Sequence, residues 1–210
     1  MKTTQICTLK ITGADATTFL QGMCTCDINT LTETALLAAC CNQKGRVIVN
    51  FYIWKSEEAY LLQLPESMQK TLKDHLIKYR IRADVNFETV ETDFLADKKT
   101  LWILTETTEQ FTPQMIDLQK HGGVSFKKGC YLGQEIIART EHLGQLKRHL
   151  QHLQSEHNDT QAGDIVTDTK QQKIGTVVTA FDAQHIYAVI EDRALEDSLF
   201  IKEKATWIAS

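Results

Sequence analysis

The chain has 210 residues, of which 42% are apolar and 24% charged, and its formal net charge is −4 at pH 7. A chain of this length and composition can bury a hydrophobic core, so wholesale disorder is excluded. The charge balance argues against a protein held to nucleic acid mainly by a basic surface. We therefore expect no direct nucleic-acid binding.

Apolar segments are too short for a membrane-spanning helix. The longest unbroken apolar run extends from Ala35 to Cys41, far short of the about 20 residues that a bilayer requires. Lys2 is followed by polar residues, and the strand-like stretch after them is interrupted by Lys10, so a secretory signal is not indicated. The sequence predicts no membrane contact and a cytoplasmic location.

Six cysteines fit a reducing compartment, where free thiols are favoured over disulfides. No Cys-x-x-Cys motif occurs, which excludes the usual zinc-ribbon and thioredoxin motifs. The one conceivable metal cluster combines Cys24 and Cys26 with the adjacent Cys40 and Cys41. Burial of these thiols as small apolar side chains is the favoured interpretation, and no metal site is predicted.

Alternating and amphipathic patterns predict mixed strands and helices up to about residue 150. Strands are expected over residues 6–11, 34–41, 46–54, 59–64, 84–90 and 100–105, and helices over 16–21, 65–79 and 133–140. The runs 34–41 and 46–54 form a hairpin across a short glycine-containing loop. Pro113 begins a further short helix that Gly122-Gly123 ends.

The composition changes after Arg148. The stretch from Ser155 to Asp164 is polar and rich in turn-forming residues, which predicts a linker or loop. Beyond it, short β-like runs over residues 165–166, 173–181, 185–190, 199–201 and 206–208 are typical of a small antiparallel barrel or sandwich. The sequence therefore predicts an α+β protein with an αβ domain over residues 1–150 and a small β-barrel domain over residues 151–210.

The densest chemical signal is the segment Lys127–Glu135, KKGCYLGQE. Cys130 lies on a turn after two lysines and before a predicted helix. The positive helix terminus and the lysines favour the thiolate and lower the thiol pKa. Gly129 and Gly133 allow backbone conformations that side chains would prevent, and they let a ligand approach closely. Cys130 is therefore predicted to be the most reactive of the six thiols.

The residues alone support a structural role for Cys130 equally well, as a buried side chain beside a solvated lysine turn. His121, His142 and His149 cannot be placed beside Cys130 from the sequence, so a cysteine protease or acyl transferase is unsupported. The segment Gly123–Gly129 is not a phosphate-binding loop, because no Gly-Lys-Ser/Thr follows it.

The block Lys128–Glu135 resembles the signature of the YgfZ-type proteins, which are folate-binding relatives of the glycine-cleavage aminomethyltransferase (T protein). The other matching stretches are Leu9–Asp27, Lys44-Gly45-Arg46, Thr112-Pro113-Gln114, Gly123–Phe126, Ala138-Arg139 and Lys147-Arg148. The resemblance spans residues 6–150, and the small C-terminal β unit agrees with it. The family has a second αβ half in its middle, whereas this chain has only residues 91–110 between Val90 and Phe111.

The resemblance implies an α+β fold, with a shortened N-terminal αβ unit of the aminomethyltransferase folate-binding type followed by a small antiparallel β-barrel-like unit. It implies an accessory protein that binds tetrahydrofolate or another folate. Such a protein would act through the reactive Cys130 in iron–sulfur cluster assembly or repair, and so in tRNA modification. Its partners would be folate and iron–sulfur proteins such as radical tRNA-modifying enzymes.

Particular residues take roles in this implied site. Lys44 and Arg46 would meet the anionic glutamate tail of a folate. Asp27 or Glu135 would accept hydrogen bonds from the pterin edge, and Trp102 and Tyr131 would stack on the pterin. The remaining implied folate-binding residues are Gln114, Lys128, Gly129, Gly133, Gln134 and Arg139.

Some of these residues have a structural alternative. Trp102 is favoured as a core aromatic, whereas Lys44 and Arg46 could equally form an exposed hairpin tip and Asp27 a cap or turn. We expect the hairpin tip and the Cys130 loop to line one concave surface, because positive charge gathers there in a protein of net charge −4.

Two other functions remain open. One is a true one-carbon (aminomethyl) transferase with tetrahydrofolate as acceptor, which needs a complete folate cavity and a nearby carboxylate, so the shortened middle argues against it. The other is a ligand-free interaction module on the same fold. That module predicts no folate binding and no effect of replacing Cys130. Tetrahydrofolate binding separates the module from the two folate-dependent functions.

Overall fold

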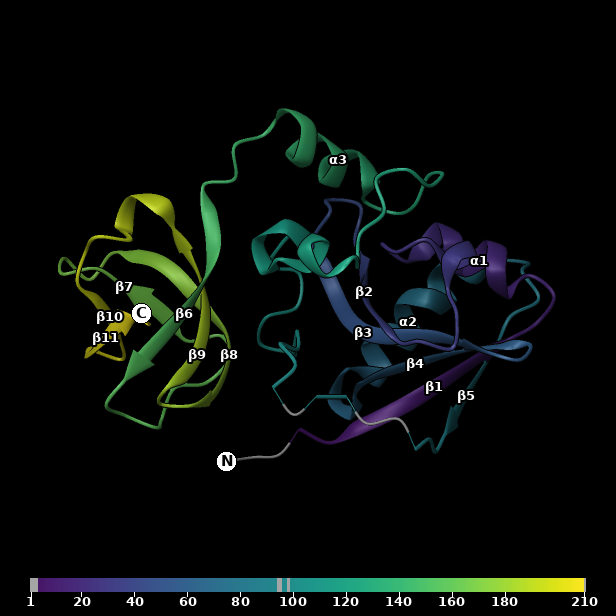
Figure 1. Cartoon of the computed structure of the whole chain (residues 1–210), viewed down its shortest axis with the longest axis horizontal. Coiled ribbons are helices and arrows are strands. Elements are labelled where there is room, and N and C mark those ends of the chain that lie inside the picture. Colours follow the sequence, from purple (N-terminus) through teal and green to yellow (C-terminus); the bar gives the residue numbers. More distant parts are fainter. Residues whose placement is uncertain (1–3, 94–95, 98, 210) are drawn as a thin grey trace.

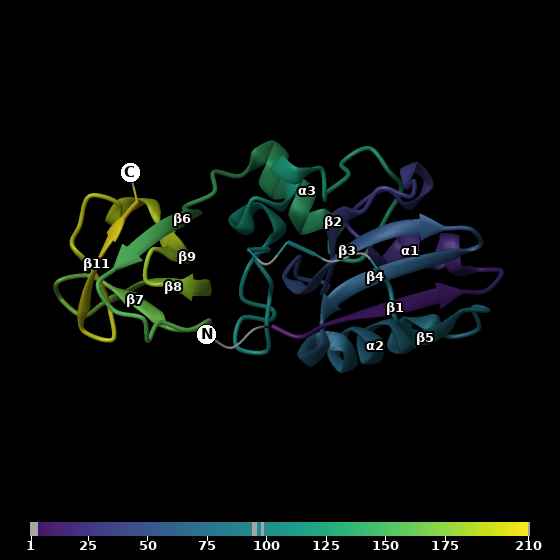
Figure 2. The same cartoon turned by 60° about the horizontal axis from the view of Figure 1, so that its bottom comes forward.

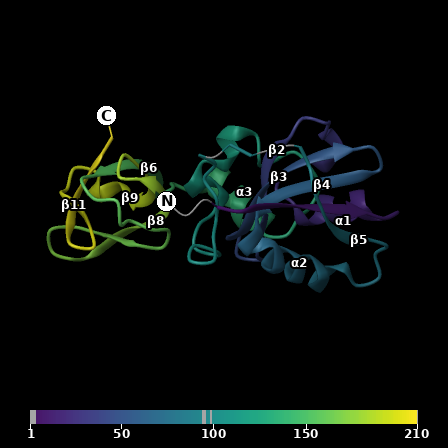
Figure 3. The same ribbon diagram turned by 90° about the horizontal axis from the view of Figure 1, so that it is seen from below.

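The computed structural model describes residues 4–93, 96–97 and 99–209, which form an αβ unit and a barrel unit lying side by side (Figure 1). Figures 2 and 3 show the same arrangement from two further directions. Residues 1–3 and 210, at the outer ends of the two predicted domains, lie outside the described residues. The helices and strands are β1 (Ile6–Thr12), α1 (Ala16–Met23), β2 (Leu36–Cys41), β3 (Val47–Ser56), β4 (Ala59–Pro65), α2 (Glu66–Arg80), β5 (Asn86–Val90), α3 (Gln134–Leu143), β6 (Arg148–Ser155), β7 (Ile165–Thr167), β8 (Lys173–Asp182), β9 (His185–Glu191), β10 (Leu199–Ile201) and β11 (Lys204–Ile208).

The αβ unit is built on an antiparallel sheet with the strand order β2-β3-β4-β1-β5. Helices α1 and α2 join one hydrophobic cluster with this sheet. Met68, Leu72 and Leu76 of α2 are fully buried in that cluster, so the helix packs on the sheet through one apolar face. None of the helices within the described residues is long and apolar enough to cross a membrane.

The connection that follows β5 packs against the sheet through the buried Asn50 of β3. Asn50 lies between Phe51 and Val49, which belong to the helix-facing cluster, so its side chain takes the other face. Its Nδ2 donates to the Leu101 carbonyl at 2.8 Å, and its Oδ1 accepts from the Ile103 N–H at 2.8 Å. The predicted strand over residues 100–105 is therefore wrong, because a side-chain amide satisfies this backbone in place of a neighbouring strand.

The short helix predicted after Pro113 is replaced by two 3₁₀ turns, Pro113–Ile116 and Leu118–His121. Asp117 separates them in a left-handed conformation with φ 57°, which breaks helical propagation. Phe111, Ile116 and other residues of this segment pack with barrel residues in one shared hydrophobic cluster. These turns therefore form part of the contact between the two units.

The second unit is a closed antiparallel barrel with the strand order β10-β11-β6-β9-β8-β7. This arrangement confirms the α+β class and the small C-terminal barrel. Strand β6 pairs with β9 and β11, yet the sequence analysis did not predict it. Polar residues occupy most of its positions, and Leu153 is its one fully buried apolar residue, so the alternating signal is weak. The predicted boundary between residues 150 and 151 falls inside this strand.

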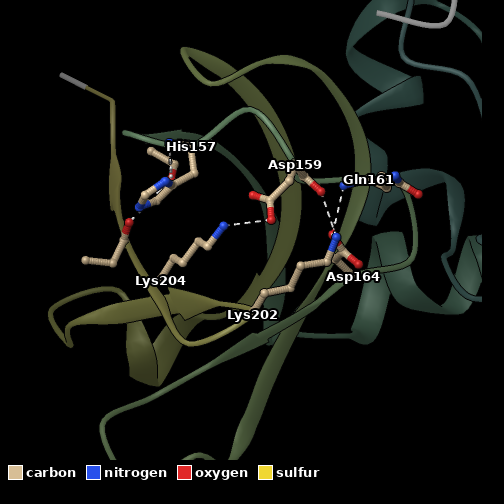
Figure 4. A network of polar contacts seen from close by, with 8 residues as sticks. His157, Asp159, Gln161, Asp164, Lys202 and Lys204 are labelled. Atoms are coloured by element: carbon tan, nitrogen blue, oxygen red, sulfur yellow. Dashed lines mark hydrogen bonds and ion pairs between the residues drawn. The ribbon is translucent and has the colours of Figure 1, made fainter.

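The polar stretch after β6 is a loop of the barrel (Figure 4). Lys204 pairs with the Asp159 carboxylate at 2.7 Å, and Lys202 pairs with the Asp164 carboxylate at 2.9 Å. Lys202 also donates to the Asp159 carbonyl at 2.7 Å. Because exposed ion pairs contribute little to stability, these contacts mainly select the path of the loop over the β10–β11 hairpin. The backbone between the units is the short stretch 144–147 that joins α3 to β6.

We predict that Asn50→Ala lowers the free energy of unfolding by about 2 kcal/mol, because it leaves a part-buried carbonyl and a buried N–H without partners. Denaturant unfolding followed by circular dichroism measures the change. The matched control is Asn86→Ala at an exposed position of β5, which should change the value by less than about 0.5 kcal/mol. Equal effects of the two substitutions would contradict the role given to Asn50.

Candidate functional site

The Cys130 loop, defined here as residues 123–133, wraps around the C-terminal end of helix α1. The Ser125 N–H donates to the Thr25 carbonyl at 2.8 Å, and the Leu132 N–H donates to the Gly22 carbonyl at 3.0 Å. The Thr25 hydroxyl donates to the Gly123 carbonyl at 2.6 Å. A helix ends with unsatisfied carbonyls, and the loop supplies donors at this end of α1.

Lys128 makes the strongest of these contacts. Its ammonium group donates to the carbonyls of Gln21 at 2.7 Å, Cys24 at 2.6 Å and Cys26 at 2.7 Å. An ammonium has three donors, and all three are used here. The same group lies 4.6 Å from the centre of the Tyr131 ring, a favourable cation–π position. We call this arrangement the Lys128 clamp.

The Lys128 clamp is buried, since only 8% of the residue is exposed. Burial lowers the pKa of Lys128, while the neighbouring thiols of Cys24 and Cys26 and the Asp27 carboxylate act in the opposite direction. The sequence analysis placed the charge of Lys128 beside the Cys130 thiol and a folate. In the structure, this ammonium group instead donates its hydrogen bonds to backbone carbonyls at the end of α1.

The hairpin between β2 and β3 packs against the start of α3. The Asn42 side chain organises the hairpin tip, because its Oδ1 accepts from the N–H groups of Lys44 at 2.9 Å and Arg46 at 3.0 Å. Gly133 has φ 84°, and a Cβ at this position would lie 2.5 Å from the Asn42 carbonyl oxygen. Glycine is therefore required at position 133, as predicted.

Gly129 differs from Gly133. Its φ lies outside the left-handed region, and a Cβ there would meet no atom within 4 Å. The expectation that Gly129 supplies a conformation closed to other residues is therefore wrong. The open space beside its backbone still allows the close approach of a ligand.

Cys130 is exposed, whereas Cys7 is half-buried and the other cysteines are buried; all six are free thiols. Burial is the main cause that raises the pKa of Cys26 and Cys41. For Cys24, a hydrogen bond with Cys40 is the largest cause, and burial follows. Across the described ranges, no three histidine, cysteine or acidic side chains gather as a metal ion would need.

Most of the implied folate-binding residues lie around the start of α3. The Gln134 Oε1 accepts from the Tyr131 N–H at 3.3 Å, and the Gln114 Nε2 donates to the Ile137 carbonyl at 2.7 Å. Asp27 is half-buried and accepts from the Gln21 Nε2 at 2.9 Å. Within the described part of the chain, the buried Gln114 Oε1 and the buried Tyr131 hydroxyl have no hydrogen-bond partner.

The other implied residues are exposed or lie apart. Lys44 is exposed at the hairpin tip, and Glu135 pairs with Arg139 at 2.8 Å on the outer side of α3. Arg46 is half-buried and donates from Nη1 to the Gln110 carbonyl at 2.8 Å.

Trp102 is buried and packs edge-on against Tyr52, with ring centres 5.8 Å apart. It takes the core position that the sequence analysis favoured. The hairpin tip and the Cys130 loop are in contact through Gly133, and a concave surface shared by them stays a prediction.

Sequence reasoning missed three residues that shape this site: Gln21, Thr25 and Asn42. Gln21 binds Lys128 through its carbonyl and Asp27 through its side chain. Thr25 links the Cys130 loop to β2, because its hydroxyl also accepts from the Ala39 N–H at 3.0 Å. Asn42 could have been found from its place at the start of a glycine-containing hairpin loop, whereas nothing local marks the other two.

No protein-family model matches the chain. Among curated proteins it is similar to "tRNA-modifying protein YgfZ" of Colwellia psychrerythraea, with 27% identity over 87% of this chain and 81% of the relative. The proteins of that name from Aliivibrio fischeri and Escherichia coli O45:K1 share 24% and 26% identity over 93% and 90% of this chain and 86% and 84% of their own lengths. The first alignment spans 263 positions, more than the 210 residues of this chain, so that relative has segments that this chain lacks.

Among solved structures, the chain is similar to the glycine cleavage system aminomethyltransferase T from Bartonella henselae, with a TM-score of 0.73. The match covers 99% of this chain and 84% of that protein, at 11% sequence identity. At this identity the likeness establishes the fold alone. Together, these comparisons confirm the resemblance to YgfZ-type proteins and to the aminomethyltransferase fold.

We predict that Lys128→Met lowers the free energy of unfolding by about 2–4 kcal/mol, because methionine keeps the apolar stem but leaves three carbonyls without their donors. Denaturant unfolding measures the loss. The matched control is Lys127→Met, which removes an exposed lysine next in sequence and should change stability by less than about 0.5 kcal/mol. A stable Lys128→Met variant would contradict the Lys128 clamp.

We also predict that limiting alkylation near neutral pH labels Cys130 first, by a factor on the order of ten or more over each other cysteine. Cys130 is the exposed thiol, and burial raises the pKa of Cys7, Cys26 and Cys41. Peptide mapping by mass spectrometry gives the order of labelling. In denaturant the difference should vanish, and earlier labelling of Cys24 or Cys26 in the folded protein would refute the prediction.

Proposed function

We propose that this protein is a tetrahydrofolate-binding accessory protein in tRNA modification, acting through Cys130 in iron–sulfur cluster assembly or repair. One observation carries the proposal: the exposed thiol lies on a loop fixed by buried contacts, in a chain similar over most of its length to proteins named tRNA-modifying. An exposed thiolate can bind iron or attack a sulfur donor. The Lys128 clamp would hold that thiol at one place on the surface.

Some of the residues that the resemblance assigns to folate binding have side chains placed as a folate site would need. The Gln114 Oε1 and the Tyr131 hydroxyl are buried without partners in the described residues, and such atoms are costly unless a ligand or water meets them. The half-buried Asp27 carboxylate can accept from paired N–H donors. The cations of Lys44 and Arg46 would meet the glutamate tail. Trp102 is not used in this proposal, because it packs in the core beside Tyr52.

We predict saturable binding of tetrahydrofolate to the purified protein, measured by calorimetry. Asp27→Asn should weaken it by about tenfold, since a charged acceptor would be lost from the pterin edge. The control Asp74→Asn, on the exposed side of α2, should bind as the wild type does. Absence of saturable binding to the wild type would contradict the folate proposal and favour a ligand-free interaction module.

In cells that lack the native protein, we predict that Cys130→Ala fails to restore iron–sulfur-dependent tRNA methylthiolation. The control Cys7→Ala, which removes a half-buried thiol of β1, should restore it. Replacing an exposed loop residue should change stability by less than about 0.5 kcal/mol, so immunoblots should show equal amounts of both variants. Full restoration by Cys130→Ala would overturn the role of the thiol, and loss of the protein itself would point to a structural role.

A true one-carbon transferase is distinguished from the proposed accessory protein by the product that it forms. Such an enzyme would convert tetrahydrofolate to a one-carbon derivative in the presence of an aminomethyl donor, whereas the proposed accessory protein would return tetrahydrofolate unchanged. Chromatography of the folate pool after incubation distinguishes the two outcomes.

A further inference from the structure

A small crevice lies between the αβ unit and the barrel, away from Cys130. Its volume is about 80 Å³, enough for a group of a few heavy atoms. The αβ unit contributes Gln110, Phe111 and Met115 to its wall, and the barrel contributes Arg148, Lys173, Ile174, Gly175, Thr176 and Val189. The space therefore exists only because the two units are in contact.

Positive charge gathers around this crevice. Arg148 and Lys173 line it directly. Arg46 does not line the crevice but contacts two residues of its wall. Its Nη1 donates to the Gln110 carbonyl at 2.8 Å and lies 3.7 Å from the Met115 sulfur. Within the described ranges, no carboxylate lies within ion-pair distance of Arg46 or Lys173.

Glu191 is the acidic group that faces this cluster. It accepts from the Arg148 guanidinium at 2.6 Å and from Arg193 at 2.7 Å. These two arginines hold the pKa of the Glu191 carboxyl below its usual range. Because Arg193 shares this carboxylate, Glu191 alone does not balance Arg148, and the crevice keeps an excess of positive charge.

We propose that this crevice binds a small oxyanion, a phosphate or a carboxylate group, held by Arg148 and Lys173 in the field of Arg46. Guanidinium and ammonium groups are the side chains that recognise such anions. Both cations are exposed, so their attraction for the anion is screened by solvent and by salt. Both basic ligands belong to the barrel, and the αβ unit contributes Gln110, Phe111 and Met115 to the wall, so a bound oxyanion would lie against both units. No residue of the Cys130 loop lines this crevice. Arg46 is shared, since the proposed function places it at the glutamate tail of a folate and its guanidinium also contacts the crevice wall.

The test uses inorganic phosphate as the probe on the full chain. At constant ionic strength, phosphate should bind saturably by calorimetry and raise the melting temperature relative to chloride. Lys173→Gln and Arg148→Gln should each weaken binding by about tenfold. The matched control Lys170→Gln removes an exposed lysine that does not line the crevice, and it should bind phosphate as the wild type does.

Two results would overturn the proposal. One is the absence of saturable phosphate binding to the wild type, and the other is equal binding by wild type, Lys173→Gln and Lys170→Gln. A competition arm identifies the source of the anion. Displacement of phosphate by a γ-linked glutamate dipeptide supports a glutamyl carboxylate as the ligand, whereas phosphate that resists the peptide supports a phosphate group.

Discussion

The buried ammonium group of Lys128 is the contact on which the rest of the site depends. It satisfies carbonyls at the end of α1 while belonging to the loop that carries Cys130. Without it, the helix end would bury unsatisfied acceptors, and the loop would lose its anchor. The clamp therefore couples the stability of the αβ unit to the position of an exposed thiol. Lys128 therefore fixes the backbone of the loop that carries the exposed Cys130.

A polar side chain, that of Asn50, also takes the place of a neighbouring strand in the αβ unit. Asn50 supplies both hydrogen bonds that a neighbouring strand would have given to residues 101–103. This lets one irregular segment pack on a sheet face with its backbone satisfied. The relative from Colwellia psychrerythraea has segments that this chain lacks.

Local patterns predicted most of the regular structure because their causes are local. The period of Met68, Leu72 and Leu76 sets the buried face of α2. Alternation predicts the first strand, and apolar, β-branched runs predict β2 and β3. Residues 100–105 and strand β6 were predicted wrongly or missed. In both cases distant partners decide the structure: Asn50 in the first, and β9 and β11 in the second.

The sequence by itself determined the α+β class, the barrel after the αβ unit and the resemblance carried by the block from Lys128 to Glu135. It could do so because composition, periodicity and a contiguous motif are properties of neighbouring residues. Only the tertiary structure decided that the Lys128 ammonium binds carbonyls at the end of α1, that Trp102 lies in the core, and that Gln110 and Lys173 line one crevice. These facts depend on which distant segments pack together, and no spacing along the chain encodes that distance.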